Sequence, residues 1–416
     1  MTLYSELLVR EKNNNPVRVG VIGAGQMGFG MVSQISTIPG MVVGGISDIK
    51  LENAQRAADA YNATASQKQD ILCSTSFREV IHSDKTEVIV DATGVPEVGA
   101  QIMLETLIAK KHIVLLNVEV DITVGPFMKK LYDAADLVYT GSDGDEPGAT
   151  MQMYEFAKSM GMEVLVAGKG KNNAPEWHAT PDTAKEKALR QHMNPHMLCA
   201  FQDGTKTMGE MNLLSNAIGY IPDVRGMHGV KADLDGTVEQ LRLKEEGGVL
   251  SQYGVVEYVD GIAPGIFCIV KGQNAGVANE LNYLMKKGER DRHILYRPYH
   301  LCSLETPLTC ARAVIEHTYA IIPQGAPVSE TVAFTKRDIK AGEPIDGIGG
   351  YSVRGVCVTH ADQVKNDFVP IGLIGGKAVA KRDIKCDEFV TGDDIELDQD
   401  TTVYRLRMLQ NAEFDK

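Results

Sequence analysis

The stretch VRVGVIGAGQMGFGMV, residues 17–32, determines the fold of the first part of the chain. Apolar residues alternate before a glycine turn and predict a buried strand, and a helical pattern follows the turn. Between them lies the spacing Gly23-x-Gly25-x-x-Gly28. Gly23 allows a tight turn, Gly25 lets the backbone approach a phosphate, and Gly28 permits close packing of helix on strand. Because a helix N-terminus also attracts negative charge, the stretch predicts a binding site for the pyrophosphate of a dinucleotide.

A second apolar run, MVVGGIS, ends at Asp48, about twenty residues after Gly28, the distance at which an acid meets the ribose of such a cofactor. Its carboxylate can accept a hydrogen bond from a ribose hydroxyl and favours NAD over NADP, although Lys50 and Arg56 lie nearby. A fold of the same kind that binds no cofactor is the alternative. The predicted contacts with NAD or NADP are Gly23, Gly25, Gln26, Met27, Gly28, Asp48, Thr93, Gly94 and Val95.

Strands and helices continue to alternate after this unit. The stretch TEVIVDATGVPEVGAQIMLETLIAKKHIVLLNVEVD, residues 86–121, predicts strand, turn, helix and strand, which implies a parallel sheet with right-handed crossovers. Its turn at Thr93 and Gly94 follows the carboxyl end of a strand, where such sheets bind their ligands, unless it is an ordinary connection. The predicted fold class is α/β, with a doubly wound parallel sheet of the Rossmann type over residues 1–165.

The composition of the 416 residues is that of a soluble globular protein with more than one domain. Apolar residues make up 44% and charged residues 23%, and no window approaches the ~18 apolar residues that a membrane span requires. A net charge of −13 argues against nucleic acid as a partner, because phosphate binding requires a basic surface. The N-terminus lacks an apolar signal region and the seven cysteines are dispersed, so we expect a cytoplasmic protein.

The stretch TGSDGDEPGAT, residues 140–150, places three carboxylates, Asp143, Asp145 and Glu146, directly before Pro147. Pro147 suits the first position of a helix, which makes Glu146 the natural N-cap. Capping and the helix dipole explain one or two of the acids, but three neighbouring like charges repel one another. Since the loop follows a strand on the ligand side of the sheet, we expect at least one acid to be catalytic or to bind a metal.

Two lysines, Lys169 and Lys171, follow the next predicted strand, in MEVLVAGKGKNN. They suit an anionic substrate and can act as general acid to a carbonyl oxygen, whereas the alternative is a solvated surface pair. If the segment around GTKTMGEMN is helical, Asp203, Lys206 and Glu210 share one face. That face is either a salt-bridge ladder or a lysine whose pKa the acids adjust. The predicted catalytic residues are Lys169, Lys171, Asp203, Lys206, Glu210 and Glu146.

The middle of the chain, residues 166–304, is expected to form a substrate-binding and catalytic domain of α+β type. Near its end, ILYRPYHLCSLETP, residues 294–307, either lines a pocket or fills a loop. The helix that follows, over residues 305–322, has enough small and apolar residues to pack back on the first sheet.

The last part of the chain contains an internal repeat. KRDIK occurs at residues 336–340 and again at 381–385, within AFTKRDIKAGEP and AVAKRDIKCDEF. Two copies are too few for a solenoid, and strands with glycine turns lie between them, so we expect one small β-rich domain over residues 328–416. The pattern resembles the SAF, or antifreeze-like, domain, which in sugar-acid enzymes assists binding of anionic sugars or oligomer contacts. A purely structural role is the alternative.

The order of these parts resembles the homoserine-dehydrogenase-like oxidoreductases, and more closely the 1-deoxyxylulose-5-phosphate reductoisomerase-like proteins that end in a SAF domain. The resemblance rests on the glycine turn, VIVDATGVPEVGA, GSDGDEPGA, LYRPYHLCSLETP and the two KRDIK copies. It implies an NAD(P)-dependent oxidoreductase of a small polyhydroxylated carbonyl or alcohol. In the reductoisomerase version, Asp143, Asp145 and Glu146 hold Mg²⁺ or Mn²⁺ and the product is 2-C-methylerythritol 4-phosphate.

Two departures weaken homoserine as the substrate. Asp203 and Lys206 are three residues apart, where homoserine dehydrogenases have a lysine four residues after the aspartate. Asn117 is followed by Val118 and Glu119, where those enzymes carry a lysine. A sugar-acid dehydrogenase, or a cofactor-bound regulator without turnover, also agrees with the pattern. We expect an anionic small-molecule substrate and a homo-oligomer.

Overall fold

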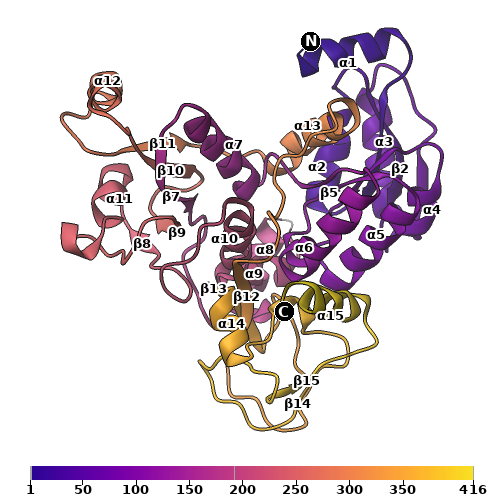
Figure 1. The fold of residues 1–416 in the computed structure, drawn as a ribbon. Helices are drawn as coiled ribbons and strands as arrows, with labels where there is room; N and C mark the ends of the chain where they lie inside the picture. The colour runs from indigo at the N-terminus through magenta and orange to yellow at the C-terminus, as the bar shows by residue number, and fades with distance from the viewer. Residues whose placement is uncertain (1, 192, 416) are drawn as a thin grey trace. The chain divides into compact units, whose positions relative to one another are not determined.

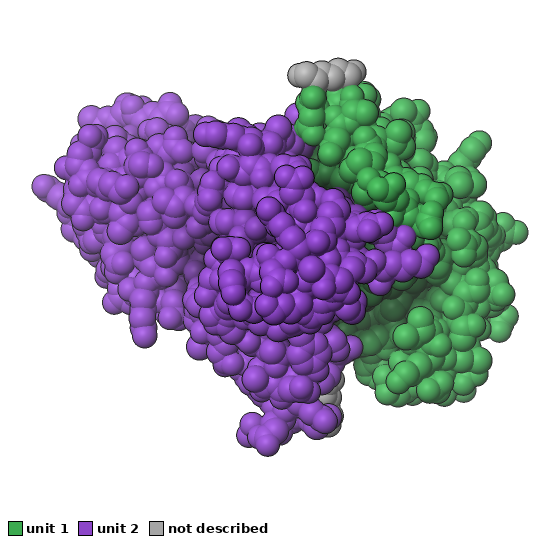
Figure 2. Space-filling model, turned by 90° about the horizontal axis from the view of Figure 1, so that it is seen from below, with its two compact units in different colours: residues 1–145, 301–322, 399–416 green, residues 146–300, 323–398 purple. Residues whose placement is uncertain are grey.

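The computed structural model describes residues 2–191 and 193–415, which form two compact units (Figures 1 and 2). Unit 1 consists of Met1–Asp145, Leu301–Ile322 and Gln399–Lys416, and unit 2 of Glu146–His300 and Pro323–Asp398. Each unit therefore combines segments that are far apart in the sequence. No helix in the described part of the chain has the length and apolar character needed to cross a lipid bilayer.

Unit 1 is built on a six-stranded sheet whose neighbouring strands are all parallel, in the order β3-β2-β1-β4-β5-β6. Its strands are β1 Val17–Ile22, β2 Met41–Ser47, β3 Leu72–Ser74, β4 Val88–Asp91, β5 His112–Leu115 and β6 Tyr139–Gly141. Its helices are α1 Leu3–Lys12, α2 Gln26–Ile35, α3 Leu51–Thr64, α4 Phe77–His82, α5 Pro96–Ile108, α6 Val118–Ala134, α13 Cys302–Ile315 and α15 Thr402–Phe414. The predicted doubly wound α/β sheet is confirmed. The strand order reverses between β1 and β4, so the turns that follow these two strands are neighbours.

The sheet of unit 1 is apolar on both faces because helices cover both. Val19, Val21, Val88 and Val90 are completely buried and join one core with residues of α2, α3 and α13. Helix α13 contacts α2, β4 and β5, and the C-terminal helix α15 contacts α5 and α6. The last helix of the chain is thus part of unit 1, whereas the sequence pattern grouped it with the repeat region.

Unit 2 contains a five-stranded mixed sheet in the order β11-β10-β7-β9-β8. Its strands are β7 Glu163–Gly170, β8 Val230–Lys231, β9 Val255–Asp260, β10 Ile266–Lys271 and β11 His293–Arg297. The helices of this part are α7 Glu146–Ser159, α8 Pro181–Arg190, α9 Pro195–Gln202, α10 Thr205–Ile218, α11 Leu234–Gln240 and α12 Ala275–Met285, with a 3₁₀ turn at Lys244–Glu246. Helix α7 contacts β7 and β10, α10 contacts β9, and the two helices contact each other, so they share one surface of the sheet.

The repeated segments form a small β-rich part of unit 2, as predicted. Its elements are β12 Ser329–Thr335, β13 Val353–Thr359, α14 His360–Asn366, a 3₁₀ turn at Ile371–Leu373, β14 Val379–Ala380 and β15 Ile395–Glu396. Ile339 and Ile384, at equal positions of the two KRDIK copies, exchange both backbone hydrogen bonds at 2.9 Å. Two ion pairs obey the same symmetry, Lys340–Asp383 and Lys385–Asp338. The copies are therefore related by an approximate twofold axis.

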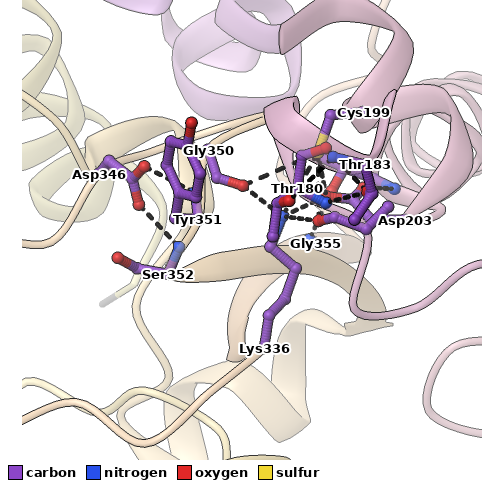
Figure 3. Close-up of polar contacts among 12 residues, drawn as sticks. Thr180, Thr183, Cys199, Asp203, Lys336, Asp346, Gly350, Tyr351, Ser352 and Gly355 are labelled. Carbon is purple, nitrogen blue, oxygen red and sulfur yellow. Dashed lines mark hydrogen bonds and ion pairs between the residues drawn. The ribbon is translucent and has the colours of Figure 1, made fainter. Parts of the chain in front are cut away.

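The two copies differ at their first lysine. The buried ammonium of Lys336 donates to Asp203 Oδ2 at 3.0 Å (Figure 3). It also donates to the carbonyl of Ala179 at 2.8 Å. Lys381 is exposed and donates to the carbonyl of Gly392 at 2.8 Å. The first copy is thus joined to the α8–α9 region by a buried ion pair, which the repeat pattern alone did not predict.

Candidate active site

The glycine turn of unit 1 has the geometry that dinucleotide binding requires. Gly23 has φ +96°, in the left-handed region, and a Cβ there would lie 2.8 Å from the carbonyl oxygen of Ala92. A Cβ at Gly28 would lie 1.9 Å from the carbonyl oxygen of Gly23, so helix and turn need glycine to pack. A Cβ at Gly25 would meet no described atom within 4 Å. Gly25 is the N-cap of α2 and is exposed, as are Gln26 and Met27, so open space adjoins the helix N-terminus.

Asp48 lies directly after β2 and is half-buried. Its Oδ2 accepts a hydrogen bond from the backbone N–H of Ala24 at 2.8 Å. Its Oδ1 accepts from the N–H of Lys50 at 2.9 Å and from Asn53 at 3.1 Å. Asp48 therefore fixes the glycine turn to the end of β2, and its predicted contact with a ribose hydroxyl stays a prediction. These groups fit the pyrophosphate and ribose of NAD or NADP.

The second predicted cofactor turn, Thr93 to Val95, is held by a buried network. Asp91 Oδ1 accepts from the hydroxyl of Thr93 at 2.7 Å, and Asp91 Oδ2 accepts from Asn117 Nδ2 at 2.9 Å. The same amide donates to the carbonyl of Val95 at 3.2 Å, and Gly94 has φ +66°. Burial raises the pKa of Asp91 to about 6. Sequence reasoning missed Asp91 and Asn117 as parts of the turn, although Asp91 ends β4 and Asn117 follows the adjacent strand β5 as the N-cap of α6.

The acids of the 140–150 loop have separate partners. Asp143 is buried, and its Oδ2 accepts from Arg312 at 2.8 Å and from the hydroxyl of Thr309 at 3.1 Å. Asp145 accepts from the thiol of Cys302 at 3.7 Å. Both contacts bind the loop to α13. Arg312 lies 169 positions from Asp143 in the sequence, so no local sequence pattern could predict this ion pair. Arg312 therefore balances the negative charge of Asp143.

Unit 2 contains a buried cluster around Lys169. Its ammonium donates to Glu146 Oε1 at 2.6 Å and forms a very short contact with Glu210 Oε2. All three side chains are buried, and they come from β7, the start of α7 and the middle of α10. Glu146 is the first residue of α7 rather than its predicted N-cap, and its carboxylate turns toward Lys169. The structure thus brings three of the predicted catalytic residues together.

Burial alone lowers the pKa of Lys169, but the charges of Glu146 and Glu210 outweigh it and raise that pKa above its ordinary value. Lys171 lies two residues further along the chain, directly after the end of β7, and donates to the carbonyl of Phe201 at 2.8 Å. Burial, followed by the charge of Lys169, lowers the pKa of Lys171 to about 8. One lysine is therefore permanently charged at neutral pH, while its neighbour can exchange a proton.

Two further side chains contact Glu146. Asn172 donates to Glu146 Oε1 at 3.1 Å, and His300 Nε2 lies 3.3 Å from the same oxygen. His300 belongs to the YRPYH segment, whose role the sequence left open, and its buried Nδ1 has no hydrogen-bond partner among the described residues. Lys206 is half-buried, and its charge opposes the rise in the pKa of Glu210 that burial and Glu146 cause.

The carboxylates do not fit the predicted Mg²⁺ or Mn²⁺ in this arrangement. Glu146 and Glu210 both bind the ammonium of Lys169, which supplies the positive charge that a metal ion would supply. Asp143 binds Arg312. A divalent ion at these groups would have to displace or approach a buried ammonium, which like charges disfavour. The metal set Asp143, Asp145 and Glu146 is therefore not supported by the donors.

The predicted helical face of Asp203, Lys206 and Glu210 is wrong at its first member. Helix α9 ends at Gln202 and α10 begins at Thr205, because Gly204 between them has φ +85°. Asp203 lies at this break, where its Oδ1 caps the N–H of Thr205 at 3.0 Å. Its Oδ2 binds Lys336, as Figure 3 shows. The glycine was the signal for the break, since it interrupts the helical pattern.

Comparisons with known proteins agree with this division of the chain. The family model of the catalytic domain of oxidoreductase DRL matches residues 144–306, and the SAF domain model matches residues 330–396. The first range contains Glu146, Lys169 and Glu210, so the buried cluster lies in the part that the family model describes as catalytic. No curated protein matches the sequence.

Similar solved structures include two dehydrogenases. A probable dehydrogenase from Thermotoga maritima is 13% identical over 73% of this chain and 90% of that chain, with a TM-score of 0.44. A myo-inositol dehydrogenase from Corynebacterium glutamicum is 13% identical over 73% of this chain and 89% of that chain, with a TM-score of 0.43.

Proposed function

We propose that this chain, an NAD(P)-dependent oxidoreductase, acts on a small polyhydroxylated carbonyl or alcohol whose reacting oxygen is served by Lys169 and Lys171. The observation that carries the proposal is the buried ammonium of Lys169 between two carboxylates, beside a lysine that can titrate. When bound, the nicotinamide supplies or accepts the hydride. The protein has to stabilise charge on the oxygen and move one proton.

Each residue of the cluster has a role in this proposal. Lys169 stays protonated and donates a hydrogen bond to the substrate oxygen, where negative charge develops during reduction. Lys171 gives its proton to that oxygen during reduction and takes it back during oxidation. Glu146 and Glu210 fix the direction of the Lys169 ammonium, and Asn172 steadies Glu146. A donor held by two buried carboxylates needs little reorganisation during the reaction.

The charge of the cluster bears on the substrate. The positive charge of Lys169 offsets only one of the two negative charges of Glu146 and Glu210. Lys171 and Lys206 add two positive charges when both are protonated, so positive charge is then in excess among these five groups. The sum favours an anionic substrate, such as a sugar acid or a phosphorylated ketose. His300 Nδ1 and Asn172 are further polar groups for substrate hydroxyls, which suits a polyhydroxylated compound.

The test is a panel of deoxyketose phosphates, sugar acids and homoserine with each of the four nicotinamide cofactors, followed by absorbance of the reduced nicotinamide. We expect turnover with an anionic hydroxylated compound. Calorimetric binding of a cofactor with no turnover for any compound would instead indicate a regulator without activity. The same panel also reports the preference between NAD and NADP, and the carboxylate of Asp48 leads us to expect NAD.

A second candidate function is reductive rearrangement of 1-deoxyxylulose 5-phosphate to 2-C-methylerythritol 4-phosphate. It rests on the resemblance of the sequence pattern alone, because the match of residues 144–306 is to an oxidoreductase catalytic domain and names no rearrangement. In the direction of reduction both candidates consume NAD(P)H, so absorbance cannot separate them. Carbon NMR of the product separates them, because rearrangement gives a branched skeleton and simple reduction leaves an unbranched one.

The pH dependence of kcat/KM provides a direct test of Lys171. Reduction requires the ammonium form, so with a pKa of about 8 the rate of reduction should fall as pH rises through that value. Oxidation requires the neutral amine, so its rate should rise through the same range. Arginine in Lys171→Arg keeps the positive charge but cannot lose its proton. The fall in the rate of reduction and the rise in the rate of oxidation near pH 8 should therefore both disappear in this variant. An unchanged pH profile in Lys171→Arg would assign proton transfer to another group.

A further inference from the structure

A second cluster of potential ligands lies in unit 2, away from Lys169, where the loop before α8 meets the second KRDIK copy. It consists of His178, Cys386 and Asp387, whose ligand atoms all lie within 4.8 Å of one another. His178 Nε2 lies 2.9 Å from Asp387 Oδ1. His178 and Asp387 are exposed and Cys386 is half-buried, so the cluster is open to solvent. None of its members contributes to the proposed catalytic cluster.

We propose that His178, Cys386 and Asp387 form a binding site for a transition-metal ion of the zinc class. An imidazole nitrogen, a thiolate sulfur and a carboxylate oxygen are the three ligand types that Zn²⁺ prefers, and water completes four-coordination. Hard ions such as Mg²⁺ prefer oxygen ligands and would not select the thiol. On binding, the thiol of Cys386 forms a sulfur–metal bond and releases its proton to solvent. Without an ion, Asp387 interacts with both His178 and the thiol of Cys386, so the three ligands already face one another.

The backbone around two of the ligands is fixed before any ion binds. The N–H of Cys386 donates to Asp338 Oδ1 at 2.9 Å, and the N–H of Asp387 donates to the carbonyl of Thr335 at 3.2 Å. Asp387 has φ +60°, an unusual conformation for a residue with a side chain. These contacts present both side chains from one tight turn. A preformed turn reduces the conformational entropy that metal binding would otherwise remove.

The third ligand is held by its own neighbour in the chain. Trp177 stacks against Arg354, whose guanidinium carbon lies 5.0 Å from the ring centroid. This contact anchors the loop that presents His178. His178 lies within residues 144–306, whereas Cys386 and Asp387 lie within the SAF match at 330–396. The ion would therefore connect the catalytic and SAF segments of unit 2.

The test uses the full-length protein, stripped with a chelator, dialysed and titrated with Co²⁺ alone. We expect one Co²⁺ per chain with a thiolate-to-cobalt absorption band, and displacement of Co²⁺ by Zn²⁺. Trp177 is the single tryptophan of the chain and adjoins His178, so its fluorescence should change with the same stoichiometry. The band should be absent in Cys386→Ser, and in His178→Ala the affinity should fall roughly 100-fold or more, since even outer-shell changes cost 10–100-fold.

Cys73→Ser is the matched control, because it removes another half-buried thiol that lies in unit 1. Its titration should equal that of the unmodified protein. The ligand positions are at the surface, so their variants should unfold at nearly the original temperature in the absence of metal. A missing band in the unmodified protein, or an equal band in Cys386→Ser, would overturn the proposal. Binding that persists in Cys386→Ser without a thiolate band would also overturn it.

Discussion

Replacing Lys169 with methionine is expected to lower kcat by about three orders of magnitude, the range in which a positioned acid or oxyanion donor contributes. Methionine has a similar length but cannot donate a hydrogen bond or carry charge. Lys169 is not among the residues predicted to contact the cofactor, so cofactor affinity should stay within about threefold of the original value. Steady-state kinetics and calorimetric binding of the reduced cofactor provide the two measurements.

The main complication is stability, because the variant leaves Glu146 and Glu210 without the ammonium between them. Removing one partner of a buried ion pair typically destabilises a protein by roughly 3–5 kcal/mol. The double variant Lys169→Met/Glu210→Gln removes one of the two carboxylate charges and should regain most of the lost thermal stability. It should not regain turnover. Turnover within about threefold of the original in the single variant, or recovered turnover in the double one, would contradict the proposed role of Lys169.

Replacing Gly25 with valine is expected to raise the Kd of the dinucleotide about a hundredfold, which corresponds to losing roughly 1.5–3 kcal/mol of hydrogen bonding to a phosphate. A Cβ at this position meets no described protein atom within 4 Å, and the φ of −66° is ordinary for any residue. The side chain should therefore enter the space that the pyrophosphate needs and leave the fold intact. Valine is a weaker N-cap than glycine, so a loss of about 1 kcal/mol in stability is expected. Calorimetry and thermal unfolding check both values.

Gly28→Ala provides the contrasting variant of the same turn. Its Cβ would lie 1.9 Å from the carbonyl oxygen of Gly23, so this change should lower thermal stability as well as cofactor affinity. We expect both variants to lose affinity for the dinucleotide and Gly28→Ala to lose more thermal stability than Gly25→Val. Unchanged affinity in Gly25→Val would mean that the dinucleotide does not bind against this helix N-terminus.

Much of the fold could be predicted because its signals are local. The glycine spacing at Gly23, Gly25 and Gly28 and the alternating strands of residues 86–121 each reflect nearby residues, and the parallel sheet follows from their order. The repeat was visible because two segments share the same letters. The return of α15 to unit 1 was not predictable, since the contacts of that helix with α5 and α6 join positions nearly three hundred residues apart.

The candidate site was predictable by residue type and only in part by arrangement. Lys169, Lys171 and Glu146 stood out because each lies at a strand end or helix start. The sequence did not predict that Lys169 would bind both Glu146 and Glu210, because such contacts depend on how α7 and α10 pack on one sheet surface. Asp203 was placed on the wrong face because the helical pattern was extended through Gly204, whose positive φ ends the helix.

The difference between the two halves of the repeat region has a consequence for chemical labelling of the protein. Its two halves share the sequence KRDIK, and the contacts between them are reciprocal around Ile339 and Ile384. The halves differ at their first lysine, since Lys336 is an interior anchor while Lys381 lies in solvent. A substitution at position 381 should therefore disturb the structure less than one at position 336. A dye or cross-linker attached at Lys381 would leave the contacts of Lys336 undisturbed.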